Sequence, residues 1–303
     1  MSEPLLWGLM RGPMTAKAIG WAADLKIADA LAAGPRPVTE LALETGVDAA
    51  ALHRTLRALA SDGVFAEDVP GVFRNTEASE LLGRDGWPEF AHLFGGVFYE
   101  MLSRFPEPFE EDFWAWLADH PAERAAFDTA MAAGKDHHSE RLAALDWDGT
   151  ETVVDVGGGN GALLRGFLAR RPDLHGIVFD LPETVRDEAT FGEHLEFVAG
   201  SFFDTVPAAE AYVLSGILHD WSDERAGAIL ITIRASAPQG ARLLLIESVI
   251  PAGNEPQGSK WLDLLMLVLG GRERTEADWR ELVGGAGFAI ESVEDGLIQA
   301  RCR

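Results

Sequence analysis

Residues 152–162 read Thr-Val-Val-Asp-Val-Gly-Gly-Gly-Asn-Gly-Ala, an apolar run that leads into a glycine-rich turn. The glycines let the backbone turn sharply and let a ligand approach the main chain without a Cβ in the way. We therefore expect a strand, a binding loop and a helix that begins near Ala162. Asp180 follows Gly161 by nineteen residues, a spacing that also fits a dinucleotide fingerprint. The loop alone does not decide which cofactor binds.

The rest of the C-terminal half alternates short apolar runs with helix-like stretches. This texture is typical of a doubly wound α/β fold, in which helices cover both faces of a parallel sheet. The last two runs, 289–293 and 297–301, are separated by only three residues, which suffices for a hairpin but not for a crossover helix. We therefore expect an antiparallel last strand. The runs expected to be parallel are 152–156, 177–179, 195–198, 211–214 and 242–246.

Two acids indicate what the glycine turn could bind. A carboxylate at Asp155, at the mouth of the turn, disfavours a pyrophosphate and favours a cation such as a sulfonium or an ammonium. Asp180, at the end of the second strand, can accept hydrogen bonds from both hydroxyls of a ribose. Asp155 thus favours S-adenosylmethionine, whereas Asp180 would serve either cofactor.

The N-terminal residues predict a winged helix. Helical periodicity covers 15–33, 38–46 and 48–63, with Asp48 as an N-cap, and the runs at 64–65 and 72–73 flank a turn. DNA binding is one interpretation, but residues 1–80 hold 7 Lys or Arg against 11 Asp or Glu, which disfavours it. We prefer dimerisation, with the apolar residues of 5–10 against a second subunit.

Residues 87–116 hold ten of the chain's 27 aromatic residues. They could form an ordinary helical core or a wall for a flat aromatic ligand, and both interpretations stay open. These residues are Trp87, Phe90, Phe94, Phe98, Tyr99, Phe105, Phe109, Phe113, Trp114 and Trp116.

Composition limits the possible partners. The 49 acidic and 25 basic residues give a formal charge of −24, which would repel nucleic acid and anionic lipid surfaces. Cys302 is the only cysteine, and the histidines lack partners at ligand spacing, so we expect neither a disulfide nor a metal site. The N-terminus lacks a secretory pattern and no stretch reaches 18 apolar residues, so we expect a cytoplasmic protein without a membrane span.

Three further motifs follow the predicted strands. They are Leu-His-Asp-Trp-Ser-Asp at 218–223, Ile-Glu at 246–247 and Gly-Arg-Glu-Arg-Thr-Glu at 271–276. Together with the glycine turn and Phe-Asp-Leu-Pro at 179–182, they resemble plant caffeic acid type O-methyltransferases and their bacterial relatives in natural-product tailoring. The resemblance covers nearly the whole chain.

The resemblance implies an α/β fold with a Rossmann-like, seven-stranded class I methyltransferase sheet and an N-terminal winged-helix dimerisation domain. The implied domains are 1–84 for dimerisation, 85–140 as an aromatic-rich helical connector and substrate wall, and 141–303 for binding S-adenosyl-L-methionine. A homodimer that methylates a hydroxyl of a small aromatic natural product is expected.

The resemblance also assigns catalytic roles. His219 matches the general base, Glu247 and Glu273 match the acids that hold its imidazole, and Asp220 matches a residue beside the substrate hydroxyl. A carboxylate on the distal imidazole nitrogen would fix the tautomer and favour the imidazolium that forms.

The expected ligand contacts combine the resemblance with the residue chemistry. Trp221 would pack on the adenine, and Ser201 would replace the acid that plant members have after Gly200. The expected cofactor residues are Asp155, Gly157, Gly159, Asp180, Ser201, Phe202, Ser215 and Trp221. The expected acceptor-lining residues are Phe127, Met131 and Met266. Lys135 departs from the plant pattern, and its ammonium is a candidate partner for the methionine carboxylate.

Three other functions compete with this one. A relative of the same fold could use the cofactor for hydroxylation, decarboxylation or cyclisation of a polyketide. A winged-helix transcription regulator and a nicotinamide-dependent oxidoreductase come from other classes. The acidic N-terminal region disfavours the regulator, and Asp155 with the histidine motif disfavours the oxidoreductase.

Overall fold

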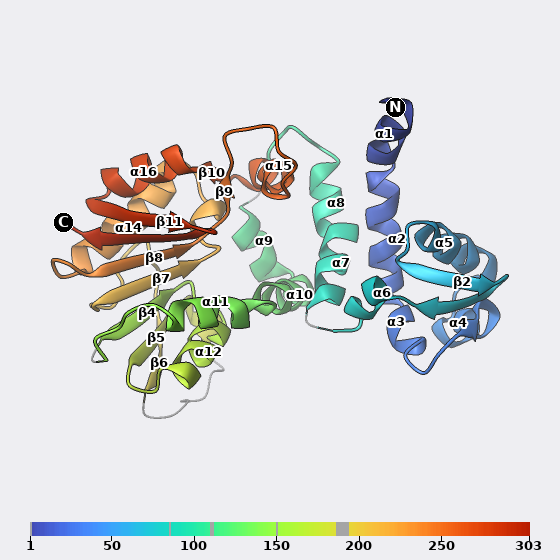
Figure 1. The fold of residues 1–303 in the computed structure, drawn as a ribbon, viewed down its shortest axis with the longest axis horizontal. Helices are drawn as coiled ribbons and strands as arrows, with labels where there is room; N and C mark the ends of the chain where they lie inside the picture. The colour runs from blue at the N-terminus through green and yellow to red at the C-terminus, as the bar shows by residue number, and fades with distance from the viewer. Residues whose placement is uncertain (1, 85, 110–111, 150, 186–193) are drawn as a thin grey trace. The chain divides into compact units, whose positions relative to one another are not determined.

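The computed structural model describes residues 2–84, 86–109, 112–149, 151–185 and 194–303. The chain divides into two compact units, shown in Figure 1. The first unit comprises residues 1–105 and 113–133, and the second comprises 106–112 and 134–303. Residues 85–140, expected as a connector, are thus shared between the two units, and the predicted boundaries at 84 and 140 stay predictions.

The second unit is built on a seven-stranded sheet in the order β11-β12-β8-β7-β4-β5-β6. The neighbours in the series β8-β7-β4-β5-β6 pair in parallel, whereas β12 runs antiparallel to both β8 and β11. The expected antiparallel last strand is therefore confirmed. The strands are β4 (Thr152–Val156), β5 (His175–Asp180), β6 (Leu195–Ala199), β7 (Ala211–Ser215), β8 (Arg242–Ile246), β11 (Phe288–Glu294) and β12 (Leu297–Cys302).

Both faces of this sheet are buried, which explains the continuous apolar runs. Alternate residues of β7 belong to different cores: Val213 packs with the core under α11 (Lys135–Ala143) and α12 (Ala162–Arg170), and Leu214 with the core under α14 (Asp223–Ser236) and α16 (Glu276–Gly285). Side chains alternate across a strand, so every position of a central strand meets apolar atoms. Short elements complete the unit: α13 (Pro182–Val185), η1 (Leu218–Asp220), β9 (Val249–Ile250), α15 (Ser259–Leu269) and β10 (Arg274–Thr275).

The order of the sheet determines where a ligand can bind. Strand β4 has parallel neighbours on both sides, β5 and β7. After β4 the chain first adds β5 and β6 on one side of this strand and then β7 and β8 on the other side. Ligands of open α/β sheets bind outside the carboxyl ends of the strands at such a switch point. Asp180 ends β5, Ser215 ends β7 and Glu247 follows β8, so the predicted site residues meet at this edge.

The first unit contains the helices and hairpin that the N-terminal sequence predicts. Asp48 caps α5 by accepting a hydrogen bond from Ala51 N at 2.8 Å, and β2 pairs antiparallel with β3. The helix expected over 15–33 is broken, because Lys26 adopts a left-handed conformation with φ 54°. The elements are α1 (Ser2–Met10), α2 (Gly12–Asp24), α3 (Ile27–Ala30), β1 (Arg36–Pro37), α4 (Val38–Thr45), α5 (Ala49–Ser61), β2 (Phe65–Val69), β3 (Val72–Asn75) and α6 (Glu77–Leu81).

Four further helices of the first unit carry the aromatic-rich sequence: α7 (Trp87–Gly95), α8 (Val97–Leu102), α9 (Phe113–Asp119) and α10 (Pro121–Ala132). Many of the rings pack on one another. The Phe113 ring lies 6.1 Å from that of Phe98 and 5.6 Å from that of Phe127, between ring centroids. Such edge-on and tilted pairs build a core, so several rings of this stretch have a structural role.

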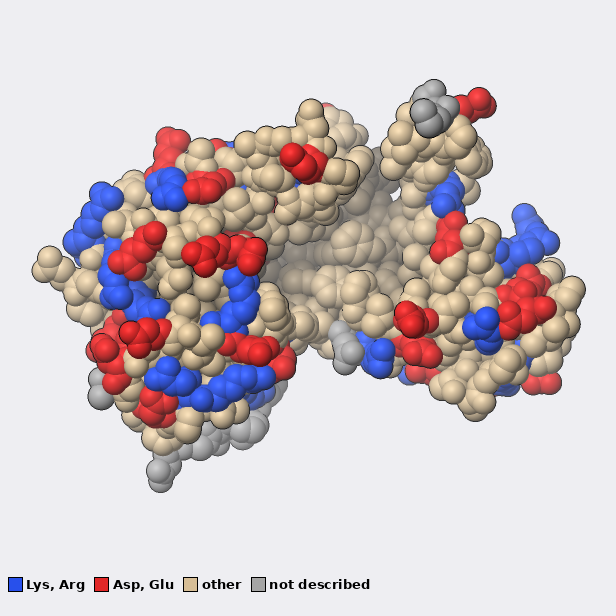
Figure 2. All heavy atoms as spheres, in the orientation of Figure 1, with Lys and Arg blue, Asp and Glu red and all other residues tan. Residues whose placement is uncertain are grey.

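The surface of the second unit carries charges of both signs. On the face in Figure 2, Lys and Arg side chains are interspersed with Asp and Glu over the strands and helices of this unit. Within the described ranges, no helix is both long and apolar enough to cross a membrane.

Helices α2 and α7 approach closely because glycines face each other. A Cβ placed on Gly20 would lie 2.7 Å from the carbonyl oxygen of Ala91 and 2.9 Å from Cα of Gly95. Real Cβ atoms do not come this close to backbone atoms, so any side chain here would force the two helices apart.

We therefore predict that Gly20→Ala lowers the free energy of unfolding by about 1–3 kcal/mol, the usual cost of overpacking. Thermal and denaturant unfolding of the full chain would measure the loss. Gly284→Ala is the matched control: it lies in α16 and a Cβ there meets no atom within 4 Å. Equal stability of the two variants would contradict the close helix contact.

Candidate active site

The glycine turn after β4 adopts a backbone that other residues avoid. Gly157, Gly159 and Gly161 have φ values of 74°, 58° and 76°. Asp180 braces the turn, because its Oδ2 accepts a hydrogen bond from Gly159 N at 2.8 Å and its Oδ1 accepts one from Leu181 N at 2.7 Å. A carboxylate has about four acceptor positions, so Asp180 keeps capacity for ligand hydroxyls, and its contact with a ribose stays a prediction.

Asp155 lies directly beneath this turn, where a Cβ on Gly158 would be 2.8 Å from its carboxyl group. The residue is 2% exposed and its Oδ2 has no hydrogen-bond partner among the described residues. Burial raises the pKa of Asp155 to about 7, and the nearby Lys135 opposes that rise. A buried, unpartnered carboxylate oxygen fits a cationic ligand group, which is the fit that S-adenosylmethionine requires.

Lys135 approaches the same edge from α11, of which it is the first residue. Its ammonium donates hydrogen bonds to the Ser215 carbonyl oxygen at 3.1 Å and to Ser215 Oγ at 2.9 Å. Burial lowers the pKa of Lys135, while the charges of Asp155, Glu247 and Asp220 act in the opposite direction. Ser215, expected near the adenine edge, is therefore bound by the ammonium of Lys135.

The imidazole of His219 lies among three carboxylates. Its Nδ1 is 3.1 Å from Oε1 of Glu273, a hydrogen bond, and 3.5 Å from Oε2 of Glu247. Its Nε2 is 3.4 Å from Oδ1 of Asp220. The structure thus brings together the four residues predicted as catalytic, with the glutamates on one ring nitrogen and the aspartate on the other.

These acids dominate the ionisation of the ring. Burial disfavours the charged imidazole, but Asp220, Glu247 and Glu273 outweigh it and raise the pKa of His219 to about 10. Burial also raises the pKa of Asp220 to about 7 and raises that of Glu247. The ligand-free site therefore favours an imidazolium at neutral pH.

The two glutamates hold different groups. Glu247 Oε1 accepts hydrogen bonds from the backbone N–H groups of Ile217 and Leu218 at 3.1 and 2.8 Å. Glu273 instead makes the direct hydrogen bond to the His219 ring. Sequence analysis assigned both acids to the imidazole and missed that Glu247 also fixes the backbone that leads to it.

Aromatic rings surround the residues predicted to contact adenine. Trp221 packs edge-on against Phe203 and Phe202, with centroid distances of 4.9 and 6.0 Å. The Arg225 guanidinium lies 4.5 Å from the centroid of the Trp221 ring. Ser201 Oγ accepts a hydrogen bond from Phe203 N at 3.2 Å. Ser201, after β6, and Trp221, after β7, thus both contact Phe203, and their contact with adenine stays a prediction.

The predicted acceptor-lining residues are divided between the units. Phe127 and Met131 lie on α10 of the first unit, where Phe127 packs on the Phe113 and Trp114 rings and Met131 is 36% exposed. Met266 lies on α15 of the second unit and is buried. Their joint lining of an acceptor pocket stays a prediction.

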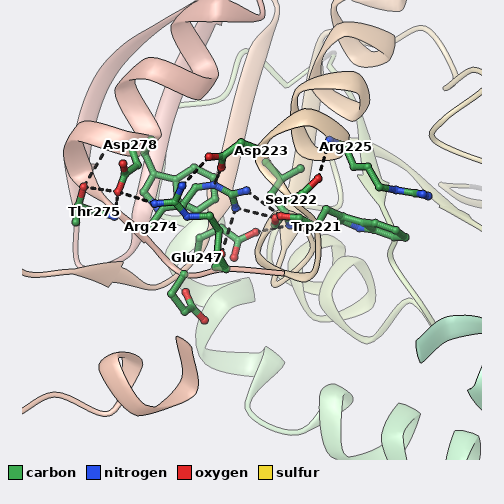
Figure 3. A network of polar contacts seen from close by, with 12 residues as sticks. Trp221, Ser222, Asp223, Arg225, Glu247, Arg274, Thr275 and Asp278 are labelled. Carbon is green, nitrogen blue, oxygen red and sulfur yellow. Dashed lines mark hydrogen bonds and ion pairs between the residues drawn. The ribbon is translucent and has the colours of Figure 1, made fainter. Parts of the chain in front are cut away.

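One buried cation of this region had no predicted role. Arg274 is fully buried and bonds to backbone carbonyls of the loop that carries His219, in the network of Figure 3. Arg274 belongs to the motif of residues 271–276, and its position next to Glu273 is the sequence signal that could have identified it. No group of three or more His, Cys, Asp or Glu residues suited to a metal occurs in the part of the chain that the structure describes.

Comparisons with known proteins match both regions of the chain. Residues 7–85 match an O-methyltransferase dimerisation domain, and residues 90–289 match an O-methyltransferase domain. Phenazine O-methyltransferase PhzM of Lysobacter antibioticus is 37% identical, over 95% of this chain and 92% of that protein. The 2,7-dihydroxy-5-methyl-1-naphthoate 7-O-methyltransferase of Streptomyces carzinostaticus is 38% identical, over 92% of this chain and 90% of that protein.

Solved structures agree with this result. The O-methyltransferase NcsB1 from neocarzinostatin biosynthesis, in complex with S-adenosyl-L-homocysteine and 1,4-dihydroxy-2-naphthoic acid, has a TM-score of 0.77 and 36% identity, with 96% of each chain covered. These matches decide against the oxidoreductase and the transcription regulator. The chain belongs to the S-adenosyl-L-methionine-dependent O-methyltransferases, with an O-methyltransferase dimerisation domain followed by an O-methyltransferase domain.

Proposed function

We propose that the chain methylates a hydroxyl group of a small aromatic natural product and that Nε2 of His219 takes the hydroxyl proton. The observation that supports this most is the orientation of the ring. Nδ1 faces Glu273 and Glu247, which leaves Nε2, beside Asp220, to meet the acceptor. A base oriented in this way by carboxylates on its other nitrogen is a recurring arrangement in acid–base catalysis.

The strength of the base fits the proposed acceptor. A phenol has a pKa near 10 and an ordinary histidine one near 6.5, a gap that costs about 5 kcal/mol. In the ligand-free site the three carboxylates raise the pKa of His219 to about 10, so they narrow this gap by favouring the protonated ring. The same effect leaves less neutral imidazole at pH 7, so the base is most available at alkaline pH.

The residues around the glycine turn have the complementary task. When bound, S-adenosylmethionine supplies a methyl group that is already activated on a sulfonium. Asp155 and Asp180 would hold and align it, and alignment of an in-line displacement is a large part of the rate gain. The chain itself must therefore provide position and a base.

The names of the relatives support an aromatic acceptor. The matched proteins include a phenazine O-methyltransferase, a dihydroxynaphthoate 7-O-methyltransferase and a 3-amino-4-hydroxybenzoate 4-O-methyltransferase. Mass spectrometry of the purified protein for bound S-adenosylhomocysteine, followed by a screen of phenolic acceptors for products heavier by one methylene, would test the proposal. Bound cofactor with an altered but unmethylated product would instead favour a non-methylation reaction.

We predict that His219→Gln lowers turnover by at least about 100-fold, because a general base typically contributes this much. Cofactor affinity, measured by calorimetry, should change little. Near-normal turnover in this variant would remove His219 from the mechanism.

We also predict that turnover of the wild-type enzyme rises with pH towards the raised pKa of His219, because only the neutral imidazole accepts a proton. Glu273→Gln should move this rise to lower pH, since one carboxylate that holds the proton on the ring is lost. Two acceptors of different acidity serve as the control: a rise that follows the acceptor's pKa would belong to the acceptor and not to His219.

Lys135 is proposed to bind the methionine carboxylate of the cofactor. Its two observed hydrogen bonds on Ser215 use two of three ammonium donors. It also begins α11, and a helix N-terminus attracts anions.

We predict that Lys135→Met weakens the binding of S-adenosylhomocysteine by about tenfold, or 1.4 kcal/mol, and leaves that of 5′-methylthioadenosine, which has no carboxylate, unchanged. Lys260→Met is the matched control, because the Lys260 ammonium bonds to the carbonyl oxygens of Gly253 and Glu255. Equal weakening of both ligands would show that Lys135 does not recognise the carboxylate.

A homodimer is proposed from the apolar face of the first unit. Five apolar residues of helix α1 are each more than half exposed: Leu5, Leu6, Trp7, Leu9 and Met10. Exposed patches of this kind indicate an interface, and the dimerisation-domain match agrees.

A cytoplasmic location stays a prediction.

Light scattering at micromolar concentration should give twice the 32.8 kDa of one chain. Leu6→Glu, which places a charge in the proposed interface, should reduce the mass towards that of one chain while circular dichroism stays the same. A wild-type mass of 32.8 kDa would overturn the homodimer.

A further inference from the structure

The loop of residues 217–221 carries His219 and Asp220, and its backbone is held from two sides. From one side, Oε1 of Glu247 accepts hydrogen bonds from Ile217 N and Leu218 N. From the other side, donors bind the carbonyl groups of the loop. The first set of bonds belongs to the proposed catalytic residues, whereas the second set has no role in the chemistry described so far.

Arg274 provides most of the second set. Its Nη1 donates to Leu218 O at 2.8 Å, its Nη2 donates to Trp221 O at 2.9 Å, and its Nε pairs with Oδ1 of Asp223 at 2.9 Å. Figure 3 shows the side chain between Asp223 and the backbone at Trp221. One planar group thus bonds to the loop both before His219 and after Asp220.

We propose that Arg274 is a positioning residue of the active site, which fixes the loop of residues 217–221 so that the His219 ring meets Glu273 and Glu247. The inference rests on the proposed role of His219 as the base.

The chemistry of the guanidinium suits this task. Arg274 is fully buried, and Asp223, the acid that pairs with it, has a side chain that is 52% exposed. Hydrogen bonds to carbonyl groups and the Trp279 ring, 5.1 Å away at its centroid, offset part of the cost of burying the charge. An apolar residue of similar volume would nevertheless serve packing alone as well or better. A planar fork of five donors can span two carbonyl groups and a carboxylate at once, which a lysine ammonium cannot. The geometry therefore explains why a cation is buried here.

The same short segment supplies the acid that binds the imidazole. Arg272 N donates to the His219 carbonyl oxygen at 2.8 Å, and Glu273 Oε1 is 3.1 Å from His219 Nδ1. Residues 272–274 thus bond to three carbonyl groups of the loop and to its histidine ring. If Arg274 no longer held the loop, His219 would move relative to Glu273 and Glu247.

The pKa of His219 separates this role from a direct charge effect. The ring is faced by Asp220 from η1, by Glu247 after β8 and by Glu273 before β10, and these acids hold its proton. Removing the positive charge of Arg274 would by itself raise the pKa of His219. A loop that drifts from the acids would lower it. Arg274→Lys keeps the charge and changes only the geometry.

The experiment is an NMR titration of histidine ring carbons in the ligand-free, full-length protein, with the His219 signal assigned from its absence in His219→Gln. In Arg274→Lys we expect the pKa of His219 to fall by at least about one unit and the plateau of turnover at high pH to fall by about tenfold. Arg274→Gln, which keeps a single amide donor, should also lower the pKa in spite of the lost charge. It is the second variant if Arg274→Lys does not fold by circular dichroism.

Arg280→Lys is the matched control, because Arg280 is an exposed residue of α16 that pairs with Glu276 on the same helix. It should leave the titration and turnover unchanged. An unchanged pKa of His219 in a folded Arg274 variant, or a raised one in Arg274→Gln, would overturn the inference. Failure of the proposed function would show differently, as normal turnover in His219→Gln.

Discussion

The site of the second unit depends on a buried imidazole that faces three carboxylates. Glu247 and Glu273 are at most 5% exposed, and each has one oxygen without a hydrogen-bond partner among the described residues. Buried carboxylates are stable only beside positive charge or hydrogen-bond donors. His219 and Lys135 are two of the cations that the chain places near these acids. The edge nevertheless keeps more acids than bases, and this excess suits a ligand that brings its own positive charge.

Glycines let the backbone approach this cluster closely. A Cβ on Gly271 would overlap the His219 carbonyl oxygen, and a Cβ on Gly296 would lie 2.6 Å from the carbonyl oxygen of Glu247. On Gly157 it would lie 2.6 Å from Cδ1 of Ile217. These three segments come from distant parts of the chain and surround the residues that flank the histidine. The loop of residues 217–221 is therefore fixed by shape as well as by hydrogen bonds.

Sequence analysis anticipated those features that follow from local pattern. Apolar runs identified the strands of the sheet, the three-residue gap before Leu297 identified the antiparallel end, and the histidine motif located the residue proposed as the base. What it missed depends on tertiary partners. The role of Glu247 on backbone N–H groups and that of Arg274 on carbonyl groups involve residues 29 to 56 positions away. The break at Lys26 was also missed, because a lysine in a left-handed conformation leaves no trace in hydrophobic periodicity.

In the proposed reaction, charge conservation links the cofactor region of the site, at Asp155, to the proposed base, His219. A cation bound beside Asp155 disfavours a second positive charge nearby, so it lowers the pKa of His219 and makes neutral imidazole available. His219 would then take the acceptor's proton, and the bound donor would supply the methyl group and lose its positive charge. The total charge among the carboxylates stays constant, because the imidazole gains the charge that the cofactor loses. The acids that favour binding of a cationic donor thus also stabilise the protonated base.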